Sequence, residues 1–205
     1  MKKMLLRGAM VTLALVTMSE SANAQIRKPQ LGIYAGASVP TGDFNEEAGI
    51  GWHAGALFKV RVTGSIDVRL DGAYNRFSTQ VIDIETARVE SESQVTFGAL
   101  NAELNLGPDS AAYPGDNSIS PYLTGGPGIY RSSFEATCTG ACTNDEASGS
   151  ESKFGFNIGA GANVPFRGIP LFVEFRYHRF GTTLPISQLS GNATMITGSI
   201  GVKLR

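Results

Sequence analysis

The strongest constraint in this sequence is a two-residue alternation of apolar side chains with small or polar ones, repeated in eight segments. In the clearest segment, Phe154, Phe156 and Ile158 alternate with glycine and asparagine. Successive side chains of a β-strand point to opposite faces, so the pattern predicts strands with one apolar face. The segments are residues 31–39, 52–62, 66–75, 93–106, 121–131, 154–164, 171–178 and 195–204, bounded by residues typical of turns. The chain is therefore predicted to be all-β.

Segment and connector lengths indicate which β architecture this is. Most segments are near ten residues long, matching the roughly 9–11 residues with which a tilted strand crosses a bilayer. No run of 18 apolar residues follows residue 25, so no membrane-spanning helix is expected there. Short connectors alternate with long polar loops such as 78–92 and 132–152, although the long linker at 107–120 departs from this rule. Because backbone groups in lipid must all be paired, we predict an eight-stranded antiparallel up-and-down transmembrane β-barrel.

Residues 1–24 have the features of a secretory signal peptide. Lys2, Lys3 and Arg7 form a basic start, residues 8–18 are apolar, and an Ala-x-Ala pattern ends at Ala24. The apolar stretch is too short to span the hydrocarbon core as a helix. We therefore expect cleavage before Gln25, export across the inner membrane, and a single barrel domain of residues 25–205.

Composition excludes several other classes of protein. Charged residues make up 17% of the chain, below the roughly 25% of an ordinary soluble domain. A mean hydropathy of −0.02 argues against a bundle of membrane helices. The formal net charge of −1 argues against a nucleic-acid-binding protein.

The polar face of the predicted strands carries both signs of charge. In a soluble sandwich or a lipocalin-type barrel these charges would face water, whereas in a membrane barrel they would face the lumen. Four aromatic residues near segment ends, Trp52, Tyr74, Tyr130 and Tyr177, suit an outward-facing interfacial girdle and favour the membrane. The candidate lumen charge network is Lys59, Arg61, Asp67, Arg69, Asp71, Glu103, Glu174, Arg176, His178 and Lys203.

The near-balance of these charges predicts a lumen closed by salt bridges. An eight-stranded barrel is only wide enough for side chains to fill, and charges buried there need partners. A general porin is therefore not expected. Val95 and Phe97 fit the opposite phase to the apolar residues that follow them, which indicates either a β-bulge or aromatic filling of the lumen.

Chemistry-bearing motifs are few. His178 is expected to pair with Glu174, and the enzymatic alternative would combine His178 with Ser187 or Ser190 of the next loop. Two distant histidines make no metal site, and no cofactor is expected. Cys138 and Cys142 are predicted to form a disulfide in an external loop, because an exported chain meets an oxidising compartment.

The loops expected to be external are acidic. They carry Asp43, Glu46 and Glu47; then Asp83, Glu85, Glu90 and Glu92; then Glu135, Asp145, Glu146 and Glu151. Acidic loops of this kind are explained by their solubility in water. The alternative interpretation is that they bind a partner, either anionic surface glycolipid through divalent cations or a host or envelope ligand. The expected partners are thus outer-membrane lipid and surface glycolipid. The protein is expected to be a monomer.

Five stretches, in this order and spacing, resemble the outer-membrane protein beta-barrel domain family, the small barrels similar to OmpA and OmpX. They are residues 40–44 (PTGDF), 51–55 (GWHAG), 121–126 (PYLTGG), 155–161 (GFNIGAG) and 173–178 (VEFRYH). The resemblance implies an eight-stranded barrel in the bacterial outer membrane, and it covers nearly the whole mature chain. Members of the family have diverse roles, so the fold alone does not give the function.

We therefore predict a non-catalytic outer-membrane barrel that supports the envelope or adheres to surfaces through its external loops. Two alternatives stay open. One is a lipid-modifying enzyme of the lipid A deacylase type that uses His178. The other is a narrow channel for small solutes.

Overall fold

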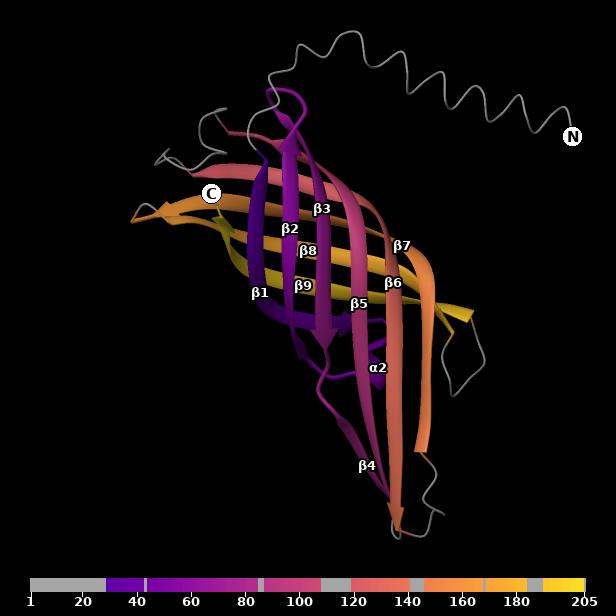
Figure 1. Cartoon of the computed structure of the whole chain (residues 1–205). Coiled ribbons are helices and arrows are strands. Elements are labelled where there is room, and N and C mark those ends of the chain that lie inside the picture. The colour runs from indigo at the N-terminus through magenta and orange to yellow at the C-terminus, as the bar shows by residue number, and fades with distance from the viewer. Residues whose placement is uncertain are drawn as a thin grey trace, which may run out of the picture.

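The computed structural model describes residues 29–42, 44–84, 87–107, 119–140, 146–167, 169–183 and 190–204. These residues form an antiparallel β-barrel with one short helix (Figure 1). The strands are β1 (Gln30–Thr41), β2 (Gly51–Arg61), β3 (Ile66–Arg76), β4 (Gln80–Ile84), β5 (Ala87–Asn105), β6 (Ser120–Gly140), β7 (Glu146–Phe166), β8 (Ile169–Thr183) and β9 (Ser190–Leu204). The helix is α2 (Phe44–Glu47).

Eight of these strands close on themselves. Each pairs with the next along the chain, β3 pairs directly with β5, and β1 pairs with β9 to complete the ring. The closing register sets Leu31 opposite Leu204 and Ala35 opposite Ile200. β4 lies outside the ring, where it forms a hairpin with the first residues of β5. The predicted eight-stranded antiparallel barrel is confirmed.

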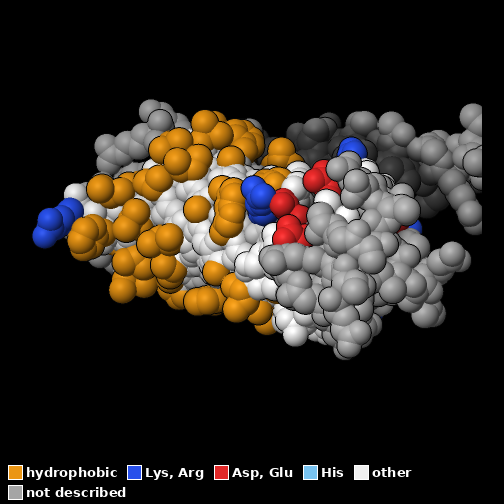
Figure 2. All heavy atoms as spheres, turned by 90° about the horizontal axis from the view of Figure 1, so that it is seen from below, with side chains coloured by type: hydrophobic (Ala, Val, Ile, Leu, Met, Phe, Trp, Pro, Cys, Tyr) orange, Lys and Arg blue, Asp and Glu red, His pale blue; other side chains and the backbone are white. Residues whose placement is uncertain are grey.

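The two faces of the wall differ as the alternation predicts. Along β3, the side chains of Ile66, Val68 and Leu70 are exposed on the outside, whereas Asp67, Arg69 and Asp71 are buried inside. Figure 2 shows hydrophobic side chains spread over the barrel wall, with a small group of acidic and basic side chains near the middle of the view. This arrangement is inverted relative to a soluble protein, because the apolar surface is outside and the charges are inside.

Phe97 and Val95 resolve the phase conflict in the fourth predicted segment. β5 keeps one continuous register with β3 from Gln94 to Leu104, so there is no bulge along this stretch of the pair. Val95 and Phe97 are buried on the lumen side together with Ala99. Aromatic filling of the lumen, one of the two alternatives, is therefore the correct one.

Tyr130 departs from the expected aromatic girdle. It is fully buried in the lumen, where its ring stacks on Phe180 with centroids 4.7 Å apart. Trp52 and Tyr74 do lie on the outside, in contact with each other. The prediction for Tyr130 was wrong because its segment is interrupted by glycines, which left the phase of its two faces undefined.

The strands β5, β6 and β7 are much longer than predicted. They contain 19, 21 and 21 residues, compared with 11 each in β2 and β3. Most of the expected loops at 78–92 and 132–152 are therefore strand. With β4 they form a sheet that extends beyond the barrel at the end opposite the chain termini (Figure 1). We call this part, β4 with residues 87–94, 131–140 and 146–153, the projecting sheet.

None of the described helical residues forms a span long and apolar enough to cross a membrane. The predicted signal peptide, residues 1–24, lies outside the described residues, and its cleavage stays a prediction.

Candidate functional site

The barrel lumen contains an ion-pair network centred on Arg69. This side chain comes from β3 and contacts carboxylates of three strands. Its Nη1 lies 2.6 Å from Oε2 of Glu174 on β8 and 3.3 Å from Oε2 of Glu103 on β5. Its Nη2 lies 2.7 Å from Oδ1 of Asp71. All four side chains are buried, so Arg69 joins opposite walls of the barrel across the lumen.

Arg176 of β8 adds a second guanidinium to the centre. Its Nη2 donates to Oε1 of Glu174 at 2.6 Å and lies 3.5 Å from Oδ1 of Asp71. Asn101 Nδ2 donates to the other oxygen of Asp71 at 2.7 Å. Two arginines therefore share two carboxylates, and the Asn101 amide contacts the second oxygen of Asp71.

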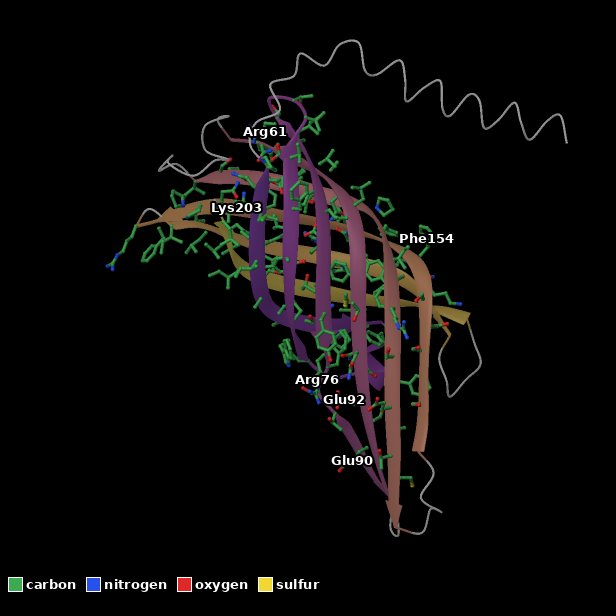
Figure 3. All side chains as sticks on the ribbon, viewed as in Figure 1. Arg61, Arg76, Glu90, Glu92, Phe154 and Lys203 are labelled. Carbon is green, nitrogen blue, oxygen red and sulfur yellow. The ribbon has the colours of Figure 1, made fainter. Side chains whose placement is uncertain are left out.

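A second group of charges lies nearer the end that carries the termini. Lys59 Nζ lies 2.5 Å from Glu103 Oε1 and 3.0 Å from Asp67 Oδ2. Arg61 Nε donates to Asp67 Oδ1 at 2.7 Å. Figure 3 shows Arg61 and Lys203 toward this end, whereas Arg76, Glu92 and Glu90 lie toward the other. Glu103 joins the two groups, because it contacts both Lys59 and Arg69.

Lys203 contributes a hydrogen bond and two cation–π contacts to the lumen. Its Nζ donates to Oδ1 of Asn163 and lies 5.9 Å from the ring centroids of Tyr122 and Phe172. Such a cation–π arrangement stabilises an ammonium group partly removed from water. Tyr122 in turn donates to Oε2 of Glu174 at 3.0 Å.

The two histidines occupy a layer next to the central network. His178 Nδ1 lies 3.1 Å from the hydroxyl of Tyr130, and its Nε2 lies 3.2 Å from Oγ1 of Thr197. The expected pairing with Glu174 is therefore replaced by two hydroxyl contacts. His53 lies between Ser38 Oγ at 3.1 Å and Ser199 Oγ at 2.8 Å.

Aromatic side chains close the lumen on the side of the projecting sheet. The ring of Phe44, from α2, packs edge-on against Phe77 and Phe180 with centroids 5.2 and 6.3 Å apart. Phe180 stacks on Tyr130, which also stacks on Phe97. α2 therefore closes this mouth of the barrel with a buried phenylalanine.

Glycine makes room for the large side chains inside the barrel. A Cβ on Gly161 would lie 2.4 Å from Cζ of Tyr122 and 2.6 Å from the carbonyl oxygen of Val173. A Cβ on Gly201 would lie 2.4 Å from the ring of Phe172. Small residues next to aromatic ones allow the narrow interior to be filled.

The energetics of this network are asymmetric. Burying ions costs desolvation energy that their mutual attraction only partly offsets, so the intact network contributes little net stability. Removing one member is costly, because it leaves another charge buried without its partner. The network therefore favours one closed arrangement of the lumen over others.

Several members of the lumen were missed by sequence reasoning. They are the asparagines 75, 101, 105, 157 and 163, the tyrosines 34, 122 and 130, and His53. The two-residue alternation places His53, Asn101 and Asn105 on the same face as the candidate charges. The candidate network contained only charged residues and His178, so these uncharged hydrogen-bonding residues were not among its members.

The acidic residues expected in external loops lie in part on strands. Glu90 and Glu92 belong to β5, Glu135 to β6 and Glu151 to β7. Glu92 faces Arg76, whose Nε lies 2.8 Å from its Oε1. Hydrogen bonds from Gln94 and Arg76 lower the pKa of Glu92. The positions of Asp43, Glu85 and Asp145 lie outside the described residues, as do the side chains of Glu46, Glu47, Asp83 and Glu146.

Within the described residues, no group of three His, Cys, Asp or Glu side chains is placed to hold a metal ion. No described cysteine is free, and Cys138 lies near the tip of β6 opposite Val89. Cys142 and Ser187 lie outside the described residues, so the Cys138–Cys142 disulfide and the role of Ser187 in the enzymatic alternative stay predictions. Ser190, the other serine of that alternative, is the first residue of β9 and not part of the loop.

Comparisons with known proteins agree with this geometry. No curated protein sequence matches the chain. Among solved structures, a major outer membrane protein from Thermus thermophilus has a TM-score of 0.54 at 11% identity, covering 87% of this chain and 100% of that one. Ail, the attachment invasion locus protein of Yersinia pestis, has a TM-score of 0.50 at 12% identity, covering 86% and 97%. These likenesses support the fold alone.

The family model described as "Outer membrane protein beta-barrel domain" matches residues 10–203. The match covers all eight strands of the ring, whose outer wall is apolar and whose lumen is charged. The chain therefore belongs to the outer membrane protein beta-barrel domain family and is a barrel of the bacterial outer membrane.

Proposed function

We propose that this protein is a non-catalytic surface attachment protein, held in the outer membrane by its barrel and acting through the projecting sheet. The supporting observation is the difference in strand length around the ring. β6 and β7 exceed β2 and β3 by ten residues each. At about 3.3 Å per residue, the excess corresponds to roughly 30 Å of strand. A strand of 9–11 residues already crosses the bilayer, so this excess serves another purpose.

Within the described residues, part of β7 in the projecting sheet pairs with another strand on one side only. Residues 146–154 of β7 pair with β6 on one side, and the pairing of β7 with β8 starts only at Gly155. Exposed strand edges carry backbone donors and acceptors that an extended segment of another protein can pair with. Side chains on this part of β7, such as Ser148 and Ser150, are small, polar and exposed. A partner bound there would add a strand to the sheet.

The lumen supports a role at the surface rather than in transport. Nη1 of Arg69 and Oε2 of Glu174 lie 2.6 Å apart across the barrel. Phe44 of α2 packs against Phe77 and closes the mouth of the barrel on the side of the projecting sheet. A passage for solutes would require these contacts to separate. The plugged lumen is thus part of the proposal, and the narrow channel is its alternative.

His178 lacks the setting that lipid-modifying chemistry requires. The side chain is fully buried in the lumen, with both ring nitrogens in contact with hydroxyl groups. A lipid substrate would lie on the outer wall, on the other side of the strand. This geometry favours the non-catalytic proposal.

The experiment trims the projecting sheet and leaves the barrel intact. Residues 132–151 are replaced by Asn-Gly, which closes the hairpin at the Arg131–Ser152 pair, and residues 78–92 are replaced in the same way between Phe77 and Ser93, whose backbone groups are hydrogen-bonded to each other. Asn-Gly is the preferred two-residue hairpin turn. The matched control is the double variant Cys138→Ser and Cys142→Ser, which keeps the sheet and removes the two cysteines that trimming also removes.

Each variant is expressed in a bacterial host whose own attachment proteins have been deleted. Attachment is counted on cultured epithelial monolayers. We expect the intact chain and the serine control to attach, and the trimmed chain to attach no better than host cells with an empty vector. Equal attachment by the trimmed and intact chains, or no attachment by the intact chain, would overturn the proposal. A heat-dependent shift in gel mobility shows that the trimmed barrel has folded.

A further inference from the structure

A small cavity lies in the lumen between the histidine layer and the ion network. Its volume is about 10 Å³, and its lining includes Tyr34, His53, Arg176, His178 and Ser199. A single water molecule needs roughly 10–15 Å³ and two to four polar partners. The cavity therefore has the size of one water molecule, and most of its lining is polar.

Two atoms of the lining side chains lack hydrogen bonds. Among the described residues, neither Tyr34 Oη nor Arg176 Nη1 has a partner. Both side chains are buried, with 8% of Tyr34 and 3% of Arg176 exposed. Buried polar atoms in native proteins are nearly always hydrogen-bonded, either to protein or to an ordered water. Two such atoms in the residues lining one cavity indicate that the cavity supplies the partner.

Charge decides which kind of molecule fits. Glu174 also lines the cavity, and it already lies 2.6 Å from Arg176. A small anion would be repelled by the Glu174 carboxylate, and a cation by the Arg176 guanidinium. A neutral molecule that both donates and accepts hydrogen bonds meets neither repulsion.

We propose that this cavity is a binding site for one ordered water molecule. The water accepts a hydrogen bond from Arg176 Nη1 and forms a second hydrogen bond with the hydroxyl of Tyr34, in which either group can be the donor. Ser199 Oγ, which lies 2.8 Å from His53 Nε2, lines the same cavity and extends the contacts to the histidine layer. The water thereby connects β1, β8 and β9 and joins the histidines to the ion network.

The substitution Tyr34→Phe tests the site through the sign of its effect. With the water in place, the variant loses a hydrogen bond, and the folding equilibrium constant should fall about fivefold. Without the water, the variant removes a buried hydroxyl that has no partner, and stability should stay the same or rise. Unfolding in urea from phosphatidylcholine vesicles measures the change.

Two control variants show how stability changes when a hydroxyl with a hydrogen-bond partner, or one without, is removed from the lumen. Tyr130→Phe removes a hydroxyl that contacts His178 at 3.1 Å, and it should destabilise the barrel in either case. Thr124→Val removes a buried hydroxyl that has no partner among the described residues and that lies outside the cavity lining. It should be neutral or stabilising. A Tyr34→Phe variant that behaves like Thr124→Val overturns the proposal.

A crystal structure in detergent provides a second, independent test. We expect one density peak within hydrogen-bond distance of Tyr34 Oη and Arg176 Nη1, with no anomalous signal after a bromide soak. A bromide signal at this position would identify an anion site and overturn the assignment to water. Absence of any peak at a resolution that shows other buried waters would overturn it as well.

Discussion

Replacing Arg69 with methionine tests whether removing one member of the lumen network destabilises the barrel. Methionine is long and flexible, so it fills much of the same space without the charge. The substitution removes contacts of 2.6 Å to Glu174, 2.7 Å to Asp71 and 3.3 Å to Glu103. All three carboxylates stay buried, and each loses a positive partner.

The size of the loss follows from what each carboxylate keeps. Glu174 keeps Arg176 at 2.6 Å, and Glu103 keeps Lys59 at 2.5 Å. Breaking a buried ion pair typically costs 3–5 kcal/mol. Because each carboxylate retains a partner, we expect Arg69→Met to lower the free energy of unfolding by about 3 kcal/mol, the lower end of that range.

The chain offers a direct assay for this prediction. Its single tryptophan, Trp52, lies on the apolar outer wall and is 52% exposed. In the folded barrel the indole contacts lipid, so its emission shifts to longer wavelength when urea unfolds the protein into water. Unfolding from phosphatidylcholine vesicles, followed through this emission, gives the free energy for each variant.

A double-mutant cycle separates the ion pair from general damage. Glu174→Gln alone should also cost about 3 kcal/mol, and the two substitutions together should cost less than their sum by about 1–3 kcal/mol. The control is Arg76→Ala, whose exposed pair with Glu92 should change stability by less than about 1 kcal/mol. A loss below about 1 kcal/mol for Arg69→Met, or a coupling near zero, would refute the reasoning.

Three further predictions concern packing, pH and conduction. Gly161→Ala should cost about 1–3 kcal/mol in urea unfolding, because its Cβ would meet an aromatic ring at 2.4 Å, whereas Gly98→Ala, with no atom within 4 Å of the new Cβ, should cost nothing. Hydrogen bonds from Gln94 and Arg76 lower the pKa of Glu92 in the folded protein. The stabilisation that they provide is therefore complete above the ordinary glutamate pKa of about 4.3, and it is lost as the pH falls through the lower pKa of the folded state. A carboxyl NMR titration of Glu92 should show a higher midpoint in the Arg76→Ala variant, and an unchanged midpoint would contradict this prediction. The intact protein in planar bilayers should show no steady single-channel steps, and regular steps would disprove the plugged lumen.

The alternation of side chains was sufficient to predict the barrel and to place the charged residues of the lumen on one face of their strands. Strand periodicity is a local property, so residues such as Asp67, Arg69 and Asp71 were assigned to one face without knowledge of their partners. It failed for Tyr130, whose strand contains glycines that carry no side-chain signal. It also failed at the strand ends, because exposed polar strands such as residues 146–153 have the composition of loops.

What the sequence by itself determined is, for most strands, which side chains share a face, because a period of two needs only the order of residues along one strand. Only the tertiary structure decided which charges meet. Arg69 and Glu174 are 105 positions apart and lie on strands that are not neighbours in the ring, so the closure and register of the whole barrel set their 2.6 Å contact. Closure likewise gave His178 its hydroxyl partners and left a cavity the size of one water between the two layers.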